Sequence, residues 1–135
     1  MKNLGINIIR NHEVFKNEYV TSYFCGSAFL NGERFDHSTT DFSAIAPVVN
    51  RLNGFFSWVI VFEDRAYVVV DRVRSIPIFY TFDSSEIFIT DSPRSVIKEQ
   101  RKISFGSRME SDFQLAGFVP GSDTLIDGLY QIPAG

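Results

Sequence analysis

The segment 71–80 (DRVRSIPIFY) contains the charged side chains of this sequence that are best placed to form ion pairs or to bind a ligand. Asp71 stands next to Arg72 and three residues before Arg74, directly after an apolar run. A carboxylate can accept two parallel hydrogen bonds from a guanidinium, and such bidentate pairs fix the geometry of a chain. We therefore expect these three residues to form a structural corner, with binding of an anion or of a neighbouring domain by an arginine as the alternative.

The residue types that usually bind metals are scarce. Cys25 is the only cysteine, so it can form neither an internal disulfide nor a zinc site by itself. His12 and His37 do not stand at metal-ligand spacing with other candidate ligands. We predict no metal.

Charge and hydropathy exclude two classes of partner. The 13 basic and 16 acidic residues are spread along the chain, so the basic surface that nucleic-acid binding needs is not expected. Apolar runs such as 58–62 are far shorter than the roughly 20 residues of a membrane-spanning helix. The N-terminal segment lacks the pattern of a secretory signal. We expect a cytoplasmic protein that binds neither nucleic acid nor membrane.

The elements that must position these residues are mostly strands. The 135 residues fit one domain, 1–135, and an apolar fraction of 44% with fourteen Phe favours sheet. Asn31-Gly32 between apolar runs 19–30 and 33–35 predicts a type I′ hairpin, because both central residues tolerate a positive φ. Apolar residues at helical spacing after Asp41 predict a helix that Asp41 caps, with Pro47 either kinking it or lying in its first turn.

Further strands follow, and with the hairpin they predict one sheet of about six strands. The runs 55–62 and 66–70 are almost continuously apolar, which predicts a hairpin buried on both faces. The remaining expected elements are strands at 76–82 and 86–90, a helix that begins at Ser92-Pro93, a helix at 110–116, and extended segments at 124–126 and 128–132.

Four segments, in this order, resemble motifs of the N-terminal glutaminase domain of asparagine synthetases. That domain is a class II glutamine amidotransferase of the N-terminal-nucleophile hydrolase group. The segments are 52–57, similar to L-x-G-x-F-A; 71–80, similar to R-D-x-x-G-x-x-P-L-Y-Y; 89–97, similar to F-A-S-E-x-K-A-L; and 116–135, similar to Y-x-P-x-x-x-T-x-x-x-G-I-x-x-L-P-P-G. The resemblance covers residues 52–135 and implies an α+β fold of packed antiparallel β-sheets with a few short helices.

The family's chemistry needs a cysteine at the mature N-terminus, whose α-amino group, with a free pKa of roughly 8, activates the thiol. Here no cysteine or hydroxyl nucleophile follows Met1, and the R-H-R-G-P-D segment that binds the substrate's carboxylate in the family is missing. The resemblance therefore implies a domain without glutaminase activity. The family's glycine is replaced by Arg74-Ser75, so we also expect a relaxed backbone at that position.

Cys25-Gly26-Ser27 is similar to the family's opening C-G-I, so cleavage after Phe24 would expose Cys25 as a nucleophile. The alternative is that Cys25 is a small buried side chain within a strand, which is the structural role that we favour.

Asn31, Gly32, Glu33 and Asp41 are candidates for remnants of a glutamine pocket. The resemblance implies that Asn31 and the Gly32 N–H would stabilise an oxyanion, while the two carboxylates would hold the substrate's amino group. A hairpin turn and a helix cap explain the same four residues without a ligand.

The resemblance leads to a functional hypothesis. We expect a non-catalytic glutaminase-like domain of an asparagine-synthetase-related, ATP-dependent amide-forming protein, which supports an ATP-pyrophosphatase-type ligase domain in cis or in trans. The S-G-G-x-D-S loop is missing here, so ATP and Mg are expected only in that ligase domain and no cofactor in this one. Alternatives are an active amidotransferase after processing to Cys25, and a free-standing binding or assembly module; a homodimer is an option in each case.

Overall fold

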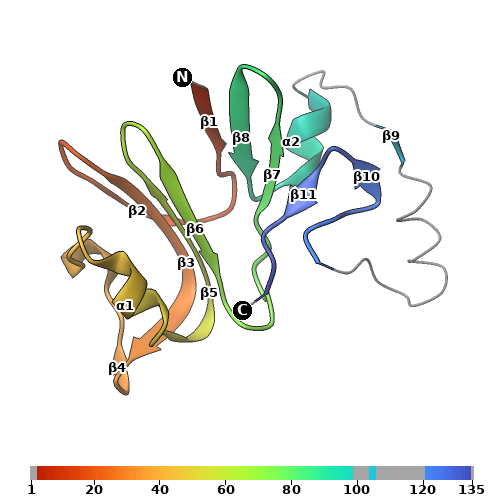
Figure 1. Ribbon diagram of the computed structural model, residues 1–135. Coiled ribbons are helices and arrows are strands. Elements are labelled where there is room, and N and C mark those ends of the chain that lie inside the picture. Colours follow the sequence, from red (N-terminus) through yellow and green to blue (C-terminus); the bar gives the residue numbers. More distant parts are fainter. Residues whose placement is uncertain (1–2, 99–103, 106–120, 135) are drawn as a thin grey trace. The chain divides into compact units, whose positions relative to one another are not determined.

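The computed structural model describes residues 3–98, 104–105 and 121–134 of the chain (Figure 1). The fold is mixed α+β, with mostly sheet and a few short helices. The chain divides into two compact units, and each is described by itself. One comprises Arg10–Pro77 with Ala134–Gly135, and the other comprises Met1–Ile9 with Ile78–Pro133.

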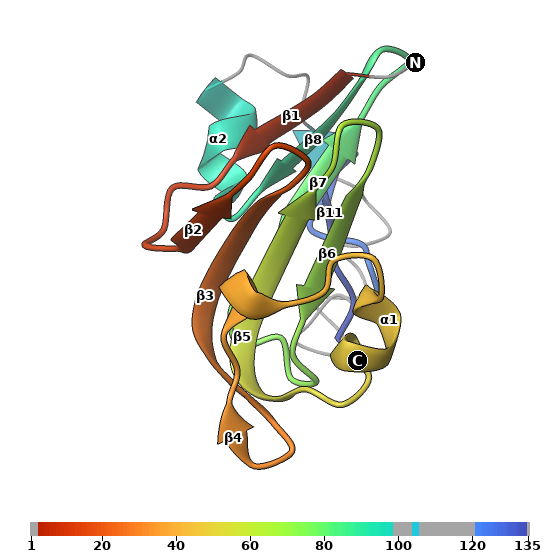
Figure 2. The same cartoon turned by 90° about the vertical axis from the view of Figure 1, so that its left-hand side faces the viewer.

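The unit around Arg10–Pro77 is built on an antiparallel sheet with the strand order β2-β3-β5-β6, and β4 pairs with β3 (Figure 2). The strands are β2 (Glu13–Lys16), β3 (Thr21–Leu30), β4 (Glu33–Arg34), β5 (Asn53–Val61) and β6 (Ala66–Val70). The predicted hairpin is confirmed, because Asn31 and Gly32 both have positive φ, 53° and 82°, between β3 and β4.

Two short helical segments lie between β4 and β5. A 3₁₀ turn, η1, spans His37–Thr39, and α1 spans Ile45–Val49. Pro47 lies in the first turn of α1, where its missing N–H costs no helical hydrogen bond. The predicted cap was wrong: Ala44 is the N-cap, and Asp41 instead accepts hydrogen bonds from the N–H and hydroxyl of Ser43.

The core of this unit lies on one face of the β3–β5 pair. Alternate residues of the two strands face it, and aromatic rings fill it, including Trp58, which is fully buried and meets Phe35 edge-on. The other buried members are Val20, Phe24, Ala28, Ile45, Leu52, Phe56 and Ile60. The prediction that the 55–70 hairpin is buried on both faces holds for Phe56–Ile60 only. It was wrong for β6, an edge strand whose Tyr67 is exposed.

The other unit contains a second sheet with the order β1-β8-β7-β11. The strands therefore do not form one sheet of about six strands, whereas more than one sheet agrees with the α+β fold that the resemblance implies. The strands of this sheet are β1 (Asn3–Asn7), β7 (Phe79–Phe82), β8 (Glu86–Thr90) and β11 (Tyr130–Gln131). The helix α2 (Pro93–Lys98) follows β8, and β9 (Ser104–Phe105) and β10 (Ile126–Asp127) form a separate antiparallel pair. β1 was not expected, and it pairs with β8 in parallel rather than antiparallel. β7 begins three residues later than predicted, whereas β8 and the start of α2 at Pro93 are as predicted.

The predicted helix at 110–116 lies outside the described residues. Within the described part of the chain, no helix has the length and apolar character needed to cross a membrane.

Candidate functional site

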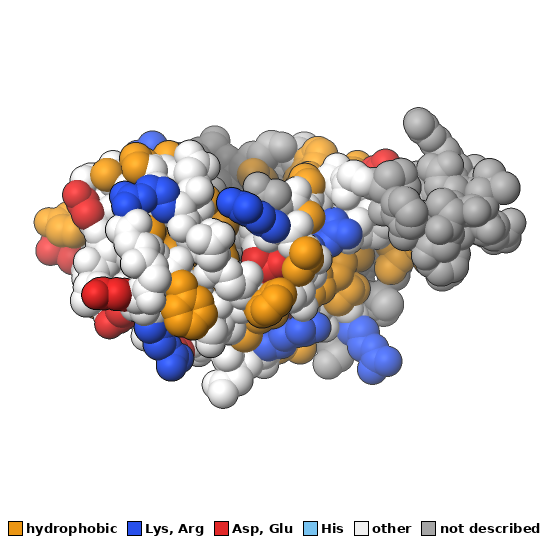
Figure 3. All heavy atoms as spheres, turned by 90° about the horizontal axis from the view of Figure 1, so that it is seen from below, with side chains coloured by type: hydrophobic (Ala, Val, Ile, Leu, Met, Phe, Trp, Pro, Cys, Tyr) orange, Lys and Arg blue, Asp and Glu red, His pale blue; other side chains and the backbone are white. Residues whose placement is uncertain are grey.

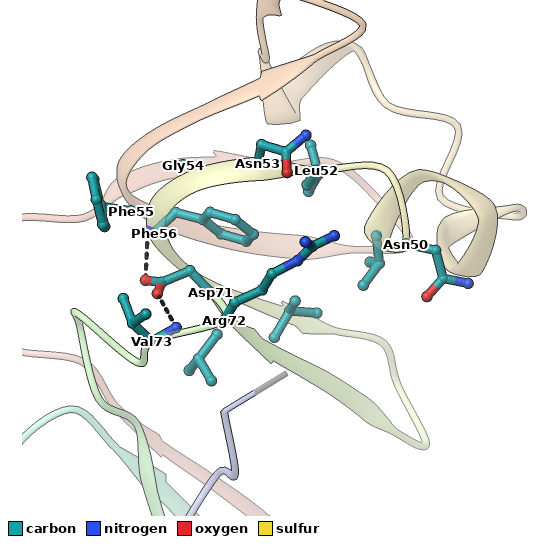
Figure 4. A pocket seen from close by; sticks show the side chains of 12 residues that line it. Asn50, Leu52, Asn53, Gly54, Phe55, Phe56, Asp71, Arg72 and Val73 are labelled. Carbon is teal, nitrogen blue, oxygen red and sulfur yellow. Dashed lines mark hydrogen bonds between the residues drawn. The ribbon is translucent and has the colours of Figure 1, made fainter.

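The chain turns sharply at Asp71, directly after β6, and the Asp71 carboxylate organises the turn (Figure 4). Asp71 is only 4% exposed. One carboxylate oxygen accepts the N–H of Phe56 at 3.0 Å and the other accepts the N–H of Val73 at 2.9 Å. The N–H and hydroxyl of Ser75 donate to the same carboxylate. One side chain therefore ties β5 to the loop that follows β6.

The hydrogen bonds also decide the charge state of this carboxyl group. Burial raises the pKa of Asp71, but donation by the Ser75 hydroxyl and by the N–H groups of Val73, Phe56 and Ser75 outweighs burial and lowers the pKa below its ordinary value. Asp71 is therefore ionised at neutral pH, and its oxygens are already occupied by donors of its own chain.

The arginine pairs expected at this corner were wrong. Within the described residues, neither Arg72 nor Arg74 forms an ion pair with Asp71, and backbone N–H groups take that role. The expected relaxation of the backbone was also wrong. Arg74 has a φ of 52°, the left-handed conformation that favours glycine, and its N–H donates to the Asp71 carbonyl at 3.0 Å.

A pocket of about 420 Å³ opens beside the Asp71 corner. Its walls come from the end of α1, the start of β5, the end of β6 and the loop after it, and Arg72 extends from the corner along the pocket toward Leu52 (Figure 4). A pocket of this volume is large enough for a small ligand. Sequence reasoning singled out Asp71 and Arg72 but did not place them in a pocket with residues of β5.

Cys25 lies in the middle of β3, as predicted, but its side chain is half-buried rather than buried. Its immediate neighbour Phe24 pairs with Glu13 of β2, and Cys25 itself pairs with Ser57 of β5. The hairpin turn at Asn31 is six residues further along, a distance of about 20 Å at the rise of an extended strand. The structure therefore does not bring Cys25 together with the predicted oxyanion-binding residues.

Two of the other predicted residues line the same pocket. Glu33 and Asp41 both line a second pocket, of about 330 Å³, together with Leu30 and Phe35. The Asp41 carboxylate is bound to Ser43, whose hydroxyl and N–H lower the pKa of Asp41.

Asn31 and Gly32 lie at the hairpin tip. The side-chain oxygen of Asn31 accepts a hydrogen bond of 2.6 Å from Arg51. Both residues are exposed, and apart from Gly32 and its two chain neighbours no atom lies within 4 Å of the position that a Cβ at Gly32 would take. A turn that stabilises the hairpin explains their positions.

Sequence reasoning missed a buried polar cluster in the core. Ser22 Oγ lies 2.7 Å from His37 Nδ1, and Trp58 Nε1 donates to the same oxygen at 2.8 Å. Burial lowers the pKa of His37, although the charge of Glu13, 3.9 Å away, raises it. Ser22 is fully buried, so this arrangement cannot present a nucleophile to a substrate. The sequence signal was a polar residue at a core-facing position of β3, between Val20 and Phe24.

The described residues contain no group of three or more His, Cys, Asp or Glu side chains placed to hold a metal ion. Comparisons of this chain with models of known protein families, with curated proteins and with solved structures find no match.

Proposed function

We propose that this chain is a non-catalytic glutaminase-like domain of an ATP-dependent, amide-forming protein related to asparagine synthetases, and that it supports a separate ligase domain. The proposal starts from the ordered motifs between residues 52 and 135. An α+β fold made mostly of sheet, with few short helices, is compatible with it.

The observation that carries the non-catalytic part is the position of Cys25. A nucleophile activated by its own α-amino group must be the first residue of a chain. Cys25 instead lies within β3, which pairs with β2 from Thr21 to Phe24 and with β5 from Thr21 to Phe29. Cleavage after Phe24 would divide the strand that contributes Val20, Phe24 and Ala28 to the core, so it would remove a large part of the apolar packing.

The Asp71 corner supports a structural role for the second motif. Its carboxylate is saturated by donors from Phe56, Val73 and Ser75 and is therefore not available to hold a substrate's amino group. This arrangement keeps a turn in place beside β5 and β6, as a supporting domain requires.

A glutaminase assay on the purified chain tests the non-catalytic part. We expect no ammonia release from glutamine above a blank, either by the wild-type chain or by Cys25→Ala. Ammonia release that depends on Cys25 would overturn the proposal, and the intact mass of the active sample would then show whether Cys25 had become the N-terminal residue.

The supporting role is tested with the ATP-pyrophosphatase-type ligase that the proposal requires, encoded in the same or a neighbouring gene. We expect pyrophosphate release by the ligase to need the present chain and to proceed with free ammonia or an amine. Equal activity of the ligase alone would contradict this role.

A free-standing binding module is the second candidate, and the pocket of about 420 Å³ beside Asp71 favours it. It would bind a small ligand through that pocket without any ligase partner. Ligand binding by the chain, combined with the lack of any effect on a ligase, would distinguish it from the first candidate.

A further inference from the structure

The strand β6 forms one edge of its sheet, because within the described residues it pairs with β5 alone. Two hydrogen bonds fix its orientation. The Phe62 N–H donates to the Arg65 carbonyl at 2.8 Å before the strand, and the Asp71 N–H donates to the Phe56 carbonyl at 3.1 Å after it. Hydrogen-bonded and non-hydrogen-bonded pairs alternate along an antiparallel ladder, so these two bonds determine which residues of β6 face β5.

The alternation leaves one row of backbone groups directed away from the sheet. Tyr67 and Val69 are hydrogen-bonded to β5. The outward N–H and C=O groups belong to Ala66, Val68 and Val70. Within the part of the chain that the structure describes, no hydrogen bond uses these outward groups.

This edge lacks the side chains that usually protect an exposed strand. Charged residues, above all Lys, and Pro hinder the pairing of an edge with another chain. The sequence of β6, AYVVV, contains neither. The opposite edge strand, β2, has the exposed residues Glu13 and Lys16 in its sequence EVFK. β6 is therefore the edge of this sheet at which a further strand can add.

The charges at the two ends of β6 indicate that the added strand is β6 of a second copy. Residues 63–65 (EDR), before the strand, carry a net negative charge, and Arg72 and Arg74, after it, carry positive charge. The Asp71 carboxylate does not offset this positive charge for a partner, because it is buried and hydrogen-bonded to its own chain. Antiparallel pairing of two copies places the negative end of each strand beside the positive end of the other, and a two-fold axis repeats this contact.

The positive end of β6 is also accessible. In Figure 1 the strand finishes at the bottom of the molecule, and Figure 3 views the molecule from that side. Lys and Arg side chains lie at this surface among hydrophobic ones (Figure 3). Arg72 is exposed, and no ion pair within the described residues uses its guanidinium.

The apolar residues of β6 fit the same two-fold arrangement. With Val68 opposite Val68 of the second copy, Ala66 faces Val70 of that copy, and the outward groups of these residues can exchange N–H···O=C bonds. Tyr67, which is 45% exposed, then lies opposite Val69 of the second copy. An aromatic and a β-branched side chain in such a closely spaced pair stabilise a sheet.

We propose that two copies of this chain associate by antiparallel pairing of their β6 strands, with Val68 at the two-fold axis and the turn at 63–65 of each copy beside Arg72 of the other. One short strand from each copy makes a small, transient interface, so we expect a Kd on the order of 10–100 µM. The inference is independent of the proposed glutaminase-like role, because it uses neither Cys25 nor a ligase partner.

Sedimentation equilibrium of the purified chain between about 5 and 500 µM tests the association. The average mass should rise from that of one chain to that of two and no further, because the pairing occupies the edge in both copies. Hydrogen exchange at the two extremes of concentration locates the contact. The amides of Ala66, Val68 and Val70 should exchange several-fold more slowly in the concentrated sample.

Proline variants separate the two edges of the sheet. Val68→Pro removes an outward N–H that β5 does not use, so the chain should fold and its Kd for association should rise about tenfold. Val14→Pro is the matched control on β2. Val14 is 60% exposed, and alternation from the hydrogen bond between the Asn17 N–H and the Val20 carbonyl directs its N–H outward. This control should change the Kd less than about twofold.

An exchange of charges tests the register without a change in the strand. Asp64→Arg and Arg72→Asp should each weaken association about tenfold, because each places like charges together at both ends of the pair. The double variant restores opposite charges and should return the Kd to within about threefold of the wild type. Both side chains are exposed, so these variants should fold. Thermal unfolding of dilute samples checks the folding of all variants, and the charge variants decide alone if a proline variant is unfolded.

Three results would overturn the proposal: a chain that stays monomeric at about 500 µM, a dimer that tolerates Val68→Pro, and a dimer that Val14→Pro weakens as much as Val68→Pro does. If the double charge variant associates no better than the single variants, the antiparallel arrangement of the two strands is wrong.

Discussion

The hydroxyl of Ser22 lies 2.7 Å from Nδ1 of His37 in the core of the sheet. The indole N–H of Trp58 is a donor only, so Ser22 Oγ accepts from it, and the hydroxyl proton of Ser22 is left for His37 Nδ1. Neutral His37 therefore carries its proton on Nε2, which faces Glu13. Protonation of Nδ1 would remove the acceptor that Ser22 uses.

The stability of the chain should fall on mild acidification. Burial lowers the pKa of His37 below its ordinary value of 6.5, against the charges of Glu13 and Asp36, which raise it. The unfolded chain then binds the proton more readily than the folded chain. The stabilisation by neutral His37 is fully present above about pH 6.5. It is lost as the pH falls from there through the lower pKa of His37 in the folded state. Urea unfolding measured between about pH 7.5 and pH 5.5 checks this.

Two variants assign this pH dependence to His37. His37→Phe keeps a ring against Phe24 but cannot titrate, so its free energy of unfolding should depend less on pH than that of the wild type. Glu13→Gln removes a charge that raises the pKa of His37, so the loss on acidification should become larger. Equal pH slopes for wild type and His37→Phe would contradict the prediction.

Asp71→Asn should destabilise the folded chain by about 2–3 kcal/mol, because an amide replaces one acceptor oxygen with a donor among buried N–H donors. The change keeps the shape of the side chain, so the loss reports the hydrogen bonds of Phe56, Val73 and Ser75. Urea unfolding at neutral pH gives the difference. Asp64→Asn is the control: Asp64 is exposed and its ion pair with Arg65 is 3.3 Å long, so less than about 0.5 kcal/mol should be lost. Similar losses in the two variants would be evidence against the role of the Asp71 corner.

Much of the sheet around β3 and β5 followed from local sequence signals. Asn31-Gly32 predicts a turn that needs two positive φ angles, and the structure has both. Pairing at longer range could not be predicted in the same way. The parallel alignment of β1 with β8 joins residues about eighty positions apart, and no turn between them fixes their register. Apolar content also did not distinguish the central strand β5 from the edge strand β6.

In the candidate site, too, the sequence indicated individual residues but not the contacts between residues far apart in the chain. Asp71 stood out in the sequence because of the arginines beside it, and its importance in the structure comes from backbone N–H groups, which every sequence possesses and which leave no signal. The pocket depends on the distance between Phe55 and Val73, eighteen residues apart, which only the pairing of β5 with β6 determines. Sequence therefore indicated the residues but not their partners.

Gly54→Ala should be among the most destabilising single changes, with a loss of about 3 kcal/mol or more. Gly54 has a φ of 129°, and an added Cβ would lie 2.2 Å from the carbonyl oxygen of Ser27 on the neighbouring strand, so the β3–β5 pairing would have to shift. Gly32→Ala is the matched control, because Gly32 also has a positive φ but open space around it. Its loss should stay near 1 kcal/mol, the cost of the backbone conformation alone. Equal losses in thermal unfolding would mean that the contact with Ser27 is not a constraint.

Arg74→Gly and Arg72→Gly should differ in their effects on stability, although both remove one positive charge and add the same flexibility to the unfolded chain. Arg74 has a φ of 52°, which costs a non-glycine residue roughly 1–2 kcal/mol, whereas Arg72 lies outside the left-handed region. Glycine relieves that cost at position 74 only, and its extra flexibility opposes folding by about 0.4–1 kcal/mol at both positions.

We therefore expect Arg74→Gly to be neutral or stabilising by up to about 1 kcal/mol, and Arg72→Gly to be destabilising by about 0.5–1 kcal/mol. Because the charge and the flexibility cancel in the comparison, the difference between the two unfolding free energies measures the strain at Arg74. Equal unfolding free energies for the two variants would show that the left-handed conformation of Arg74 does not strain the corner after Asp71.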